Sequence, residues 1–219
     1  DINLITIDGS DARDFDDAVW AEKDQAKNNE DGWCIIVAIA DVAHYVKPND
    51  ALDIDARKRG NSVYFPDRVV PMLPEALSNG MCSLRPNEDR ACLAVQIIID
   101  NKGKKLSHNF FRGLMRSKAR VTYEDLQSIF ESKEKVHESE SFIARLAVPL
   151  YGAFNALHTA RINRGALDIE VPEMQVQLDT KGNVESIKDR DRLDSHRLIE
   201  EFMVLANVCA AETLEEKKH

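Results

Sequence analysis

The sequence lacks several features that would place it in other protein classes. No apolar run approaches the roughly 18 residues that a membrane-spanning helix needs, and the longest, residues 34–40, has the length of a strand. There is no CxxC pair among the four cysteines, which argues against a structural zinc site. A signal peptide, internal repeats and low-complexity tracts are also missing. We therefore expect a folded, cytoplasmic protein with no membrane segment.

An excess of positive charge is also missing. The formal net charge over 219 residues is -9, whereas a simple nucleic-acid-binding module is usually basic. Metal-binding carboxylates add negative charge, so a nuclease site remains possible, but contacts with phosphate would then need local basic patches or other domains. Lys118 and Arg120 are candidates for such contacts or for a solvated edge. Cys34, Cys92 and Cys209 lie in apolar contexts and are expected in the core, which favours a reducing compartment.

Strand and helix signals alternate without a strict βαβ rhythm, which predicts an α+β fold with a mixed β-sheet and packed helices. Turns at residues 101–104 and 179–183 predict two hairpins. The expected strands are residues 2–7, 18–22, 33–40, 63–66, 91–100, 106–116, 175–178 and 184–187. The expected helices are residues 49–59, 74–78, a short helix capped by Thr122, residues 141–164, and a long helix from about residue 194.

Proline and glycine refine these helix boundaries. Gly60 and Gly165 are expected to end the helices that precede them. Pro149 must either kink the helix at residues 141–164 or mark its true start, because proline removes a helical hydrogen bond.

Five aspartates fall within ten residues directly after the first expected strand: Asp8, Asp11, Asp14, Asp16 and Asp17. Like charges this close repel one another, and bound divalent cations relieve the repulsion. Mg²⁺ prefers carboxylate oxygens, and two such ions about 4 Å apart serve phosphodiester hydrolysis. On an extended chain Asp14 and Asp16 face the same side, whereas Asp17 joins them only if the backbone is irregular.

Other interpretations of these residues stay open on the sequence alone. An acidic run is often a solvated surface loop. A calcium-binding EF-hand loop needs a spacing of acidic residues and glycine that starts at neither Asp8 nor Asp14. His44 and Asp41 together suggest a catalytic base, although a histidine at a strand end is more often structural.

The acidic segment, residues 6–18 (TIDGSDARDFDDA), resembles the signature of the ribonuclease II and ribonuclease R family. Further blocks follow in the family's order. They are residues 37–46 (VAIADVAHYV), 61–66 (NSVYFP), 71–78 (PMLPEALS), 82–86 (CSLRP) and 198–207 (LIEEFMVLAN). The match spans nearly the whole chain, and the ribonuclease R branch is the more similar one.

The resemblance implies part of the catalytic domain of a processive 3′→5′ exoribonuclease. Such an enzyme hydrolyses RNA to nucleoside 5′-monophosphates with Mg²⁺, here two ions. By position, Asp8, Asp14, Asp16 and Asp17 match the family's catalytic, metal-binding aspartates. Asp8 and Asp17 would be the most direct ligands, and Asp16 the residue whose loss most damages the chemistry. Asp11 matches no catalytic position and is expected at the surface.

Two further residues match substrate-binding positions of the family. Tyr64 matches the aromatic residue that stacks on the 3′-terminal base of single-stranded RNA, and Glu200 matches an acidic residue near the terminal nucleotide. The alternatives are a core aromatic beside Pro66 and an exposed helical glutamate. The family's second stacking position, usually Phe, falls on Ile169, which stacks less well.

The family's catalytic domain is longer than residues 1–219 and carries a downstream arginine that stabilises charge at the scissile phosphate. It is also flanked by OB-fold RNA-binding domains, with a cold-shock type before it. We therefore expect a single truncated domain, an excised piece that is slow or inactive without those partners. The rival functions are a catalytically inactive RNA-binding homologue, which the four aspartates disfavour, and a metal-dependent phosphatase for small substrates.

Overall fold

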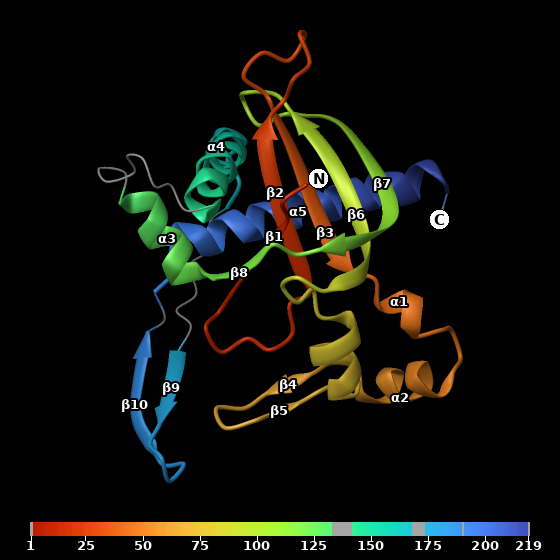
Figure 1. Cartoon of the computed structure of the whole chain (residues 1–219), viewed down its shortest axis with the longest axis vertical. Helices are drawn as coiled ribbons and strands as arrows, with labels where there is room; N and C mark the ends of the chain where they lie inside the picture. Colours follow the sequence, from red (N-terminus) through yellow and green to blue (C-terminus); the bar gives the residue numbers. More distant parts are fainter. Residues whose placement is uncertain (1, 133–141, 168–173, 190, 219) are drawn as a thin grey trace.

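A computed structural model describes residues 2–132, 142–167, 174–189 and 191–218 (Figure 1). The α+β prediction is confirmed, because a six-stranded mixed sheet packs against helices. Its strand order is β7-β6-β3-β2-β1-β8, with β8 parallel to β1 and the other neighbours antiparallel. The strands are β1 (Ile5–Asp8), β2 (Asp17–Lys23), β3 (Trp33–Ala40), β6 (Asp89–Ile99), β7 (Lys105–Arg116) and β8 (Ala119–Thr122).

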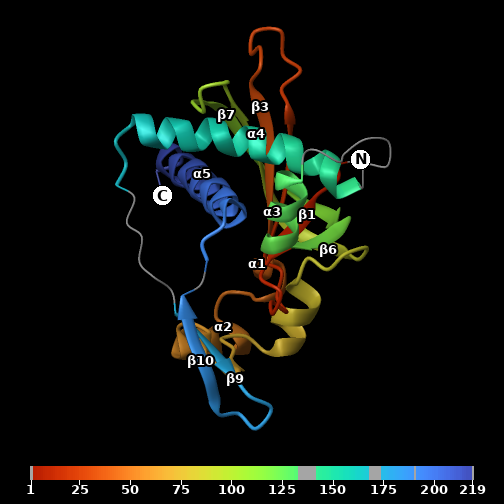
Figure 2. The same ribbon diagram turned by 90° about the vertical axis from the view of Figure 1, so that its left-hand side faces the viewer.

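Three helices cover one face of this sheet: α3 (Tyr123–Glu131), α4 (Phe142–Asn163) and α5 (Asp194–Glu216) (Figure 2). Alternate residues of the central strands point toward them, so Val19, Val37 and Val95 form one buried row across β2, β3 and β6. Phe154 and Phe202 are buried in the same core. Each fully buried side chain of this size contributes about 1.5–3 kcal/mol, so this layer is the main source of stability.

A second buried cluster lies on the opposite face. It joins sheet residues such as Ile36 and Ala94 to Phe15 from the acidic segment and to Leu77 and Leu84 from the chain around the π-helix η1 (Ala76–Cys82). Beyond this cluster lie α1 (Val42–Tyr45), α2 (Ala51–Arg59) and the hairpin of β4 (Val63–Tyr64) and β5 (Val69–Val70) (Figure 1). The acidic segment is thus packed against the sheet by Phe15.

Most of the expected elements are present. Thr122 caps α3 through its hydroxyl, which accepts a hydrogen bond from the Asp125 amide, and Gly60 ends α2 with φ 81°. The second expected hairpin is β9 (Met174–Leu178) with β10 (Val184–Asp189). All four cysteines are buried and free, as expected for Cys34, Cys92 and Cys209. Among the described helices, none combines the length and apolar character needed to cross a bilayer.

Three local expectations need correction. Pro149 lies inside α4, so it does not mark the helix start. The helix expected at residues 74–78 is a π-helix that extends to Cys82. Strand β8 was not expected, because it has four residues and its partner β1 lies more than a hundred residues earlier.

The two β-hairpin turns provide a matched test of packing between a turn and a helix. Asp100 and Asp179 start similar turns, in which Gly103 and Gly182 have φ 77° and 81°. A Cβ on Gly103 would lie 2.3 Å from the carbonyl oxygen of Ala156 in α4, whereas one on Gly182 would meet nothing within 4 Å.

We therefore expect Gly182→Ala to cost about 1–2 kcal/mol of unfolding free energy, from the left-handed backbone alone. Gly103→Ala should cost about 1–3 kcal/mol more, because backbone atoms of α4 must also move. Urea unfolding of both variants measures the difference. Equal losses would show that the turn does not press against the helix.

Candidate active site

The acidic segment connects two adjacent strands at one end of the sheet. β1 ends at Asp8 and β2 begins at Asp17, and the antiparallel pairing of Ile5 with Val19 places these two ends side by side. Residues 9–16 between them form a turn, closed by a hydrogen bond from the Ala12 amide to the Gly9 carbonyl, and then an irregular stretch. The backbone before Asp17 is irregular, which is the condition for Asp17 to join Asp14 and Asp16.

The carbonyl groups of this segment are held by Arg120 on β8. Its Nη2 lies 2.9 Å from the Gly9 and Ser10 oxygens, and its guanidinium lies 5.0 Å from the centre of the Phe15 ring. Hydrogen bonds from a charged donor are stronger than neutral ones. Arg120 is exposed, as expected for a solvated edge, and its guanidinium also holds the backbone of the acidic segment.

Two other contacts fix the second half of the segment. The Phe15 amide donates to Ser83 Oγ at 3.0 Å, and the Leu84 amide donates to the Phe15 carbonyl at 2.8 Å. The Ala40 amide, at the end of β3, donates to the Asp16 carbonyl at 2.8 Å. The roles of Arg120 and Ser83 could not be expected from the sequence, because each residue reaches the segment from a distant part of the chain and no local sequence pattern indicates such a contact.

The four aspartates influence one another electrostatically. The pKa of Asp8 is raised to about 7, mainly by burial and then by the charge of Asp17. Asp16 and Asp14 add to this rise, and Arg120 opposes it. Burial, followed by the charge of Asp16, raises the pKa of Asp17 to about 6. The pKa of Asp16 is raised by burial and then by Asp14. The structure therefore brings the four predicted aspartates into one electrostatic cluster.

Two buried oxygens of this cluster bear on its fit to a divalent cation. Asp8 Oδ2 and Asp17 Oδ2 are both buried and, among the residues the structure describes, have no hydrogen-bond partner. Such an oxygen is costly unless something satisfies it, and hard cations prefer carboxylate oxygens. Within the same residues, no three carboxylate, imidazole or thiolate side chains converge closely enough to hold a metal ion. The donor chemistry fits Mg²⁺, and full coordination requires movement of these side chains.

Tyr64 lies beside the acidic cluster although it comes from the β4–β5 hairpin. Its ring is 66% exposed, so the alternative of a core aromatic is wrong. Partial burial raises the pKa of the Tyr64 hydroxyl, and the charges of Asp14 and Asp16 and a hydrogen bond with Asp14 raise it further. An exposed ring beside the carboxylates is placed where a substrate base could stack.

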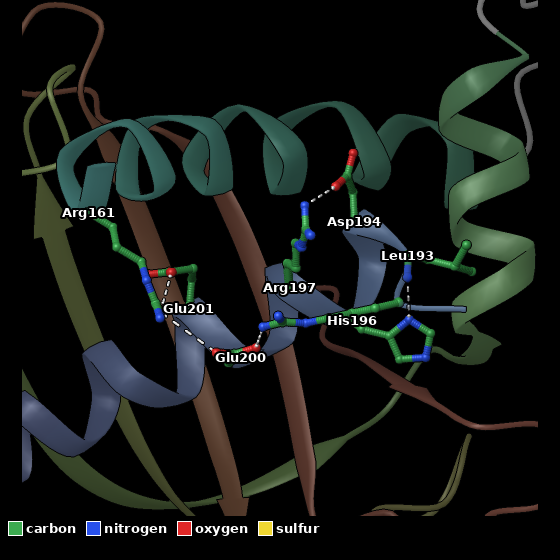
Figure 3. A network of polar contacts seen from close by, with 8 residues as sticks. Arg161, Leu193, Asp194, His196, Arg197, Glu200 and Glu201 are labelled. Carbon is green, nitrogen blue, oxygen red and sulfur yellow. Dashed lines mark hydrogen bonds and ion pairs between the residues drawn. The ribbon is translucent and has the colours of Figure 1, made fainter. Parts of the chain in front are cut away.

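Glu200 belongs to a different group of charged residues between α4 and α5 (Figure 3). Its carboxylate lies 2.6 Å from Arg192 Nη2 and 3.6 Å from Arg161 Nη1, while Arg161 also binds the buried Glu201 at 2.9 Å. The substrate-binding role of Glu200 stays a prediction. Ile169 lies outside the described residues.

His44 and Asp41 do not form a catalytic pair. The Asp41 carboxylate is buried and lies 3.3 Å from Arg112 Nε, and the His44 ring packs edge-on against Tyr45. The only hydrogen bond between the two runs from the His44 amide to the Asp41 carbonyl, in the described structure. These contacts support the structural interpretation of His44.

The fold and the site define an α+β domain with an acidic cluster at one end of a mixed sheet. The family model of the RNB domain matches residues 1–219, so the chain belongs to the RNB-domain family.

Two curated relatives are ribonuclease R of Vibrio parahaemolyticus, 44% identical, and ribonuclease R of Escherichia coli, 42% identical. Each match covers 100% of this chain and 26% of the relative, so the chain spans about a quarter of the length of these proteins. Mycoplasma genitalium ribonuclease R, solved with ribose methylated single-stranded RNA, is 29% identical with a TM-score of 0.90. That match covers 100% of this chain and 33% of the other.

The fold also occurs in yeast Ssd1, described as a pseudonuclease, with 18% identity and a TM-score of 0.71. The match covers 99% of this chain and 25% of that one. At this identity the likeness concerns the fold alone, so the fold by itself does not decide whether a chain is catalytic.

The raised pKa values give a pH-dependent stability to the metal-free chain. A carboxyl whose pKa rises from 3.8 to about 7 on folding binds its proton more tightly in the folded state. Its favourable contribution is complete below the unfolded pKa and is lost as pH rises through the folded one.

Asp8→Asn should therefore raise the Tm of the metal-free chain at pH 8, by on the order of 2–4 °C, and change it less at pH 4. Thermal unfolding in EDTA measures this. Asp11→Asn, in the exposed part of the same segment, is the control. If the change in Tm had the same pH dependence in both variants, the raised pKa would not belong to Asp8.

The contacts of Arg120 make a second prediction. Arg120→Gln should accelerate hydrogen exchange at the Ala12 and Phe15 amides by about tenfold, because charge-assisted bonds worth roughly 1.5–3 kcal/mol are lost. Arg116→Gln, which removes an exposed ion pair with Asp89, is the matched control. If exchange in the acidic segment is unchanged, Arg120 does not hold it.

Proposed function

We propose that this chain is part of a Mg²⁺-dependent, processive 3′→5′ exoribonuclease that hydrolyses RNA to nucleoside 5′-monophosphates. One observation carries the proposal: Asp8 and Asp17 hold buried carboxylate oxygens that have no hydrogen-bond partner among the described residues, and burial and neighbouring carboxylates raise the pKa of both. Repulsion and unsatisfied oxygens both favour a bound cation. Family membership supports phosphodiester hydrolysis as the reaction.

Asp8, Asp14, Asp16 and Asp17 are the proposed ligands. When bound, two Mg²⁺ ions would supply the positive charge that activates water and stabilises the leaving oxygen of the phosphodiester. The chain's own contribution is to hold these carboxylates together at the sheet end. It does so through the hydrogen bond that the Ala40 amide donates to the Asp16 carbonyl and the one that the Phe15 amide donates to Ser83 Oγ.

The proposed substrate is the 3′ end of single-stranded RNA. The exposed Tyr64 ring supports this, because stacking on an aromatic ring accepts any base and so suits a sequence-independent enzyme. We propose that Glu200 contacts the terminal nucleotide, which requires it to exchange its ion pair with Arg192 for the substrate.

The family resemblance is the basis for proposing OB-fold RNA-binding domains in the parent protein, and the curated relatives, about four times as long as this chain, have room for them. Their absence here would weaken RNA binding and slow turnover. Metal binding depends on residues of this chain alone and is therefore the more direct measurement.

The test compares wild type with Asp16→Asn and Asp11→Asn. We expect calorimetry to detect Mg²⁺ or Mn²⁺ binding to wild type and Asp11→Asn, and at least tenfold weaker binding to Asp16→Asn. With 5′-labelled RNA in Mg²⁺, wild type should shorten the oligomer from its 3′ end slowly, and Asp16→Asn should not.

Unchanged metal binding by Asp16→Asn would contradict the metal site. Metal and RNA binding without any cleavage, even at high enzyme concentration, would favour an RNA-binding homologue or an inactive piece. Faster hydrolysis of a nucleotide monoester than of RNA would identify a phosphatase instead.

A further inference from the structure

A basic depression lies on the other flank of the acidic segment. It has a volume of about 520 Å³ and is lined by Arg13 and Phe15 of the segment, Arg120 of β8, and Asn79, Arg85 and Glu88 from the chain around and after η1. Three arginines therefore surround a single carboxylate. That carboxylate, Glu88, is already paired with Arg90.

Two of the three arginines are available to a ligand. Arg120 donates from Nη2 to the backbone carbonyls of the acidic segment. Arg13 and Arg85 are exposed, and within the described ranges neither guanidinium makes a hydrogen bond or an ion pair. In a chain with a net charge of -9, two unpaired guanidinium groups in one depression are a notable local excess of positive charge.

The polar and aromatic neighbours define the class of ligand. The amide oxygen of Asn79 accepts from Ser78 Oγ, which leaves its NH₂ group as a donor. Phe15 is 8% exposed and covered by Arg120, so its ring offers no face to a base. Hydrogen-bond donors and planar cations without a stacking platform suit a phosphate group rather than a base.

The position of the depression relates it to the acidic cluster. Arg13 and Phe15 line the depression. Asp14 and Asp16 instead lie near Tyr64 of the β4–β5 hairpin, where their charges raise the pKa of its hydroxyl. Successive residues of the segment thus point to opposite flanks, and Arg13 is directly bonded to a proposed metal ligand. A phosphate held by Arg13 would belong to a nucleotide close to the one that reacts.

We propose that Arg13 and Arg85 form a subsite for a backbone phosphodiester of single-stranded RNA, next to the reacting phosphate. This inference rests on the proposed function, since it places the substrate of the same site. It also accounts for how an acidic chain contacts a polyanion: the contact is local and lies on one flank of the metal site.

The experiment measures binding of a fluorescein-labelled single-stranded oligoribonucleotide to the 219-residue chain by anisotropy in EDTA, across a range of salt concentrations. We expect Arg13→Gln/Arg85→Gln to weaken binding about tenfold at low salt. The slope of log K against log salt should fall in magnitude by about 0.7, because the two arginines contact the same phosphate.

The matched control is Arg145→Gln/Arg164→Gln, which removes two exposed arginines on and just after α4 with the same change in net charge. An oligodeoxyribonucleotide should show the same loss as RNA, because a phosphate subsite does not read the ribose 2′-hydroxyl. Circular dichroism confirms that each variant is folded.

A loss in the control equal to that in Arg13→Gln/Arg85→Gln would overturn the subsite, since only net charge would then matter, and would leave the proposed function standing. Competition by adenosine 5′-monophosphate that depends on Arg13 and Arg85, with unchanged oligomer binding, would overturn it in favour of a mononucleotide site. Failure of wild type to bind RNA under any condition would overturn the subsite, and Mg²⁺ binding measured by calorimetry would then test the proposed function separately.

Discussion

Repulsion between carboxylates confined to one end of a sheet is the constraint on which the rest of this structure depends. Asp8 and Asp17 are held next to each other because β1 and β2 pair, and the core beneath those strands fixes the pairing. The charges cannot separate without loss of that packing. Burial, and after it this repulsion, raises the pKa values of Asp8 and Asp17, and each keeps a buried oxygen without a hydrogen-bond partner among the described residues.

The segment between these strands carries opposite chemistry on its two flanks. Asp14 and Asp16 lie toward Tyr64, while Arg13 and Phe15 lie toward Arg120 and Arg85. Arg120 is central to this arrangement because it binds the backbone of the segment and also lowers the pKa of Asp8. One side chain thus couples the backbone conformation of the segment to the charge of the cluster.

The parts of the site that the sequence predicted are those determined by neighbouring residues. The strand that leads into Asp8 follows from local composition, and the irregular backbone before Asp17 is the condition that the four aspartates set if they are to converge. The contacts that complete the site come from far along the chain. Arg120 acts from a four-residue parallel strand that pairs only because β1 is already in place, and Ser83 binds Phe15 across 68 residues. Local patterns contain no information about such pairings, so neither role was predictable.

The contrast between this site and the rest of the described chain supports a functional origin. Two buried carboxylates elsewhere are paired: Glu201 binds Arg161, and Asp41 binds Arg112. At the sheet end, partly buried carboxylates face one another and leave two oxygens unsatisfied. Local rules of stability are broken mainly where function requires it. Replacement of one aspartate by asparagine would relieve the repulsion, so stability alone would not retain all four. The most economical reason to retain them is a ligand of positive charge, which converts the repulsion into binding energy.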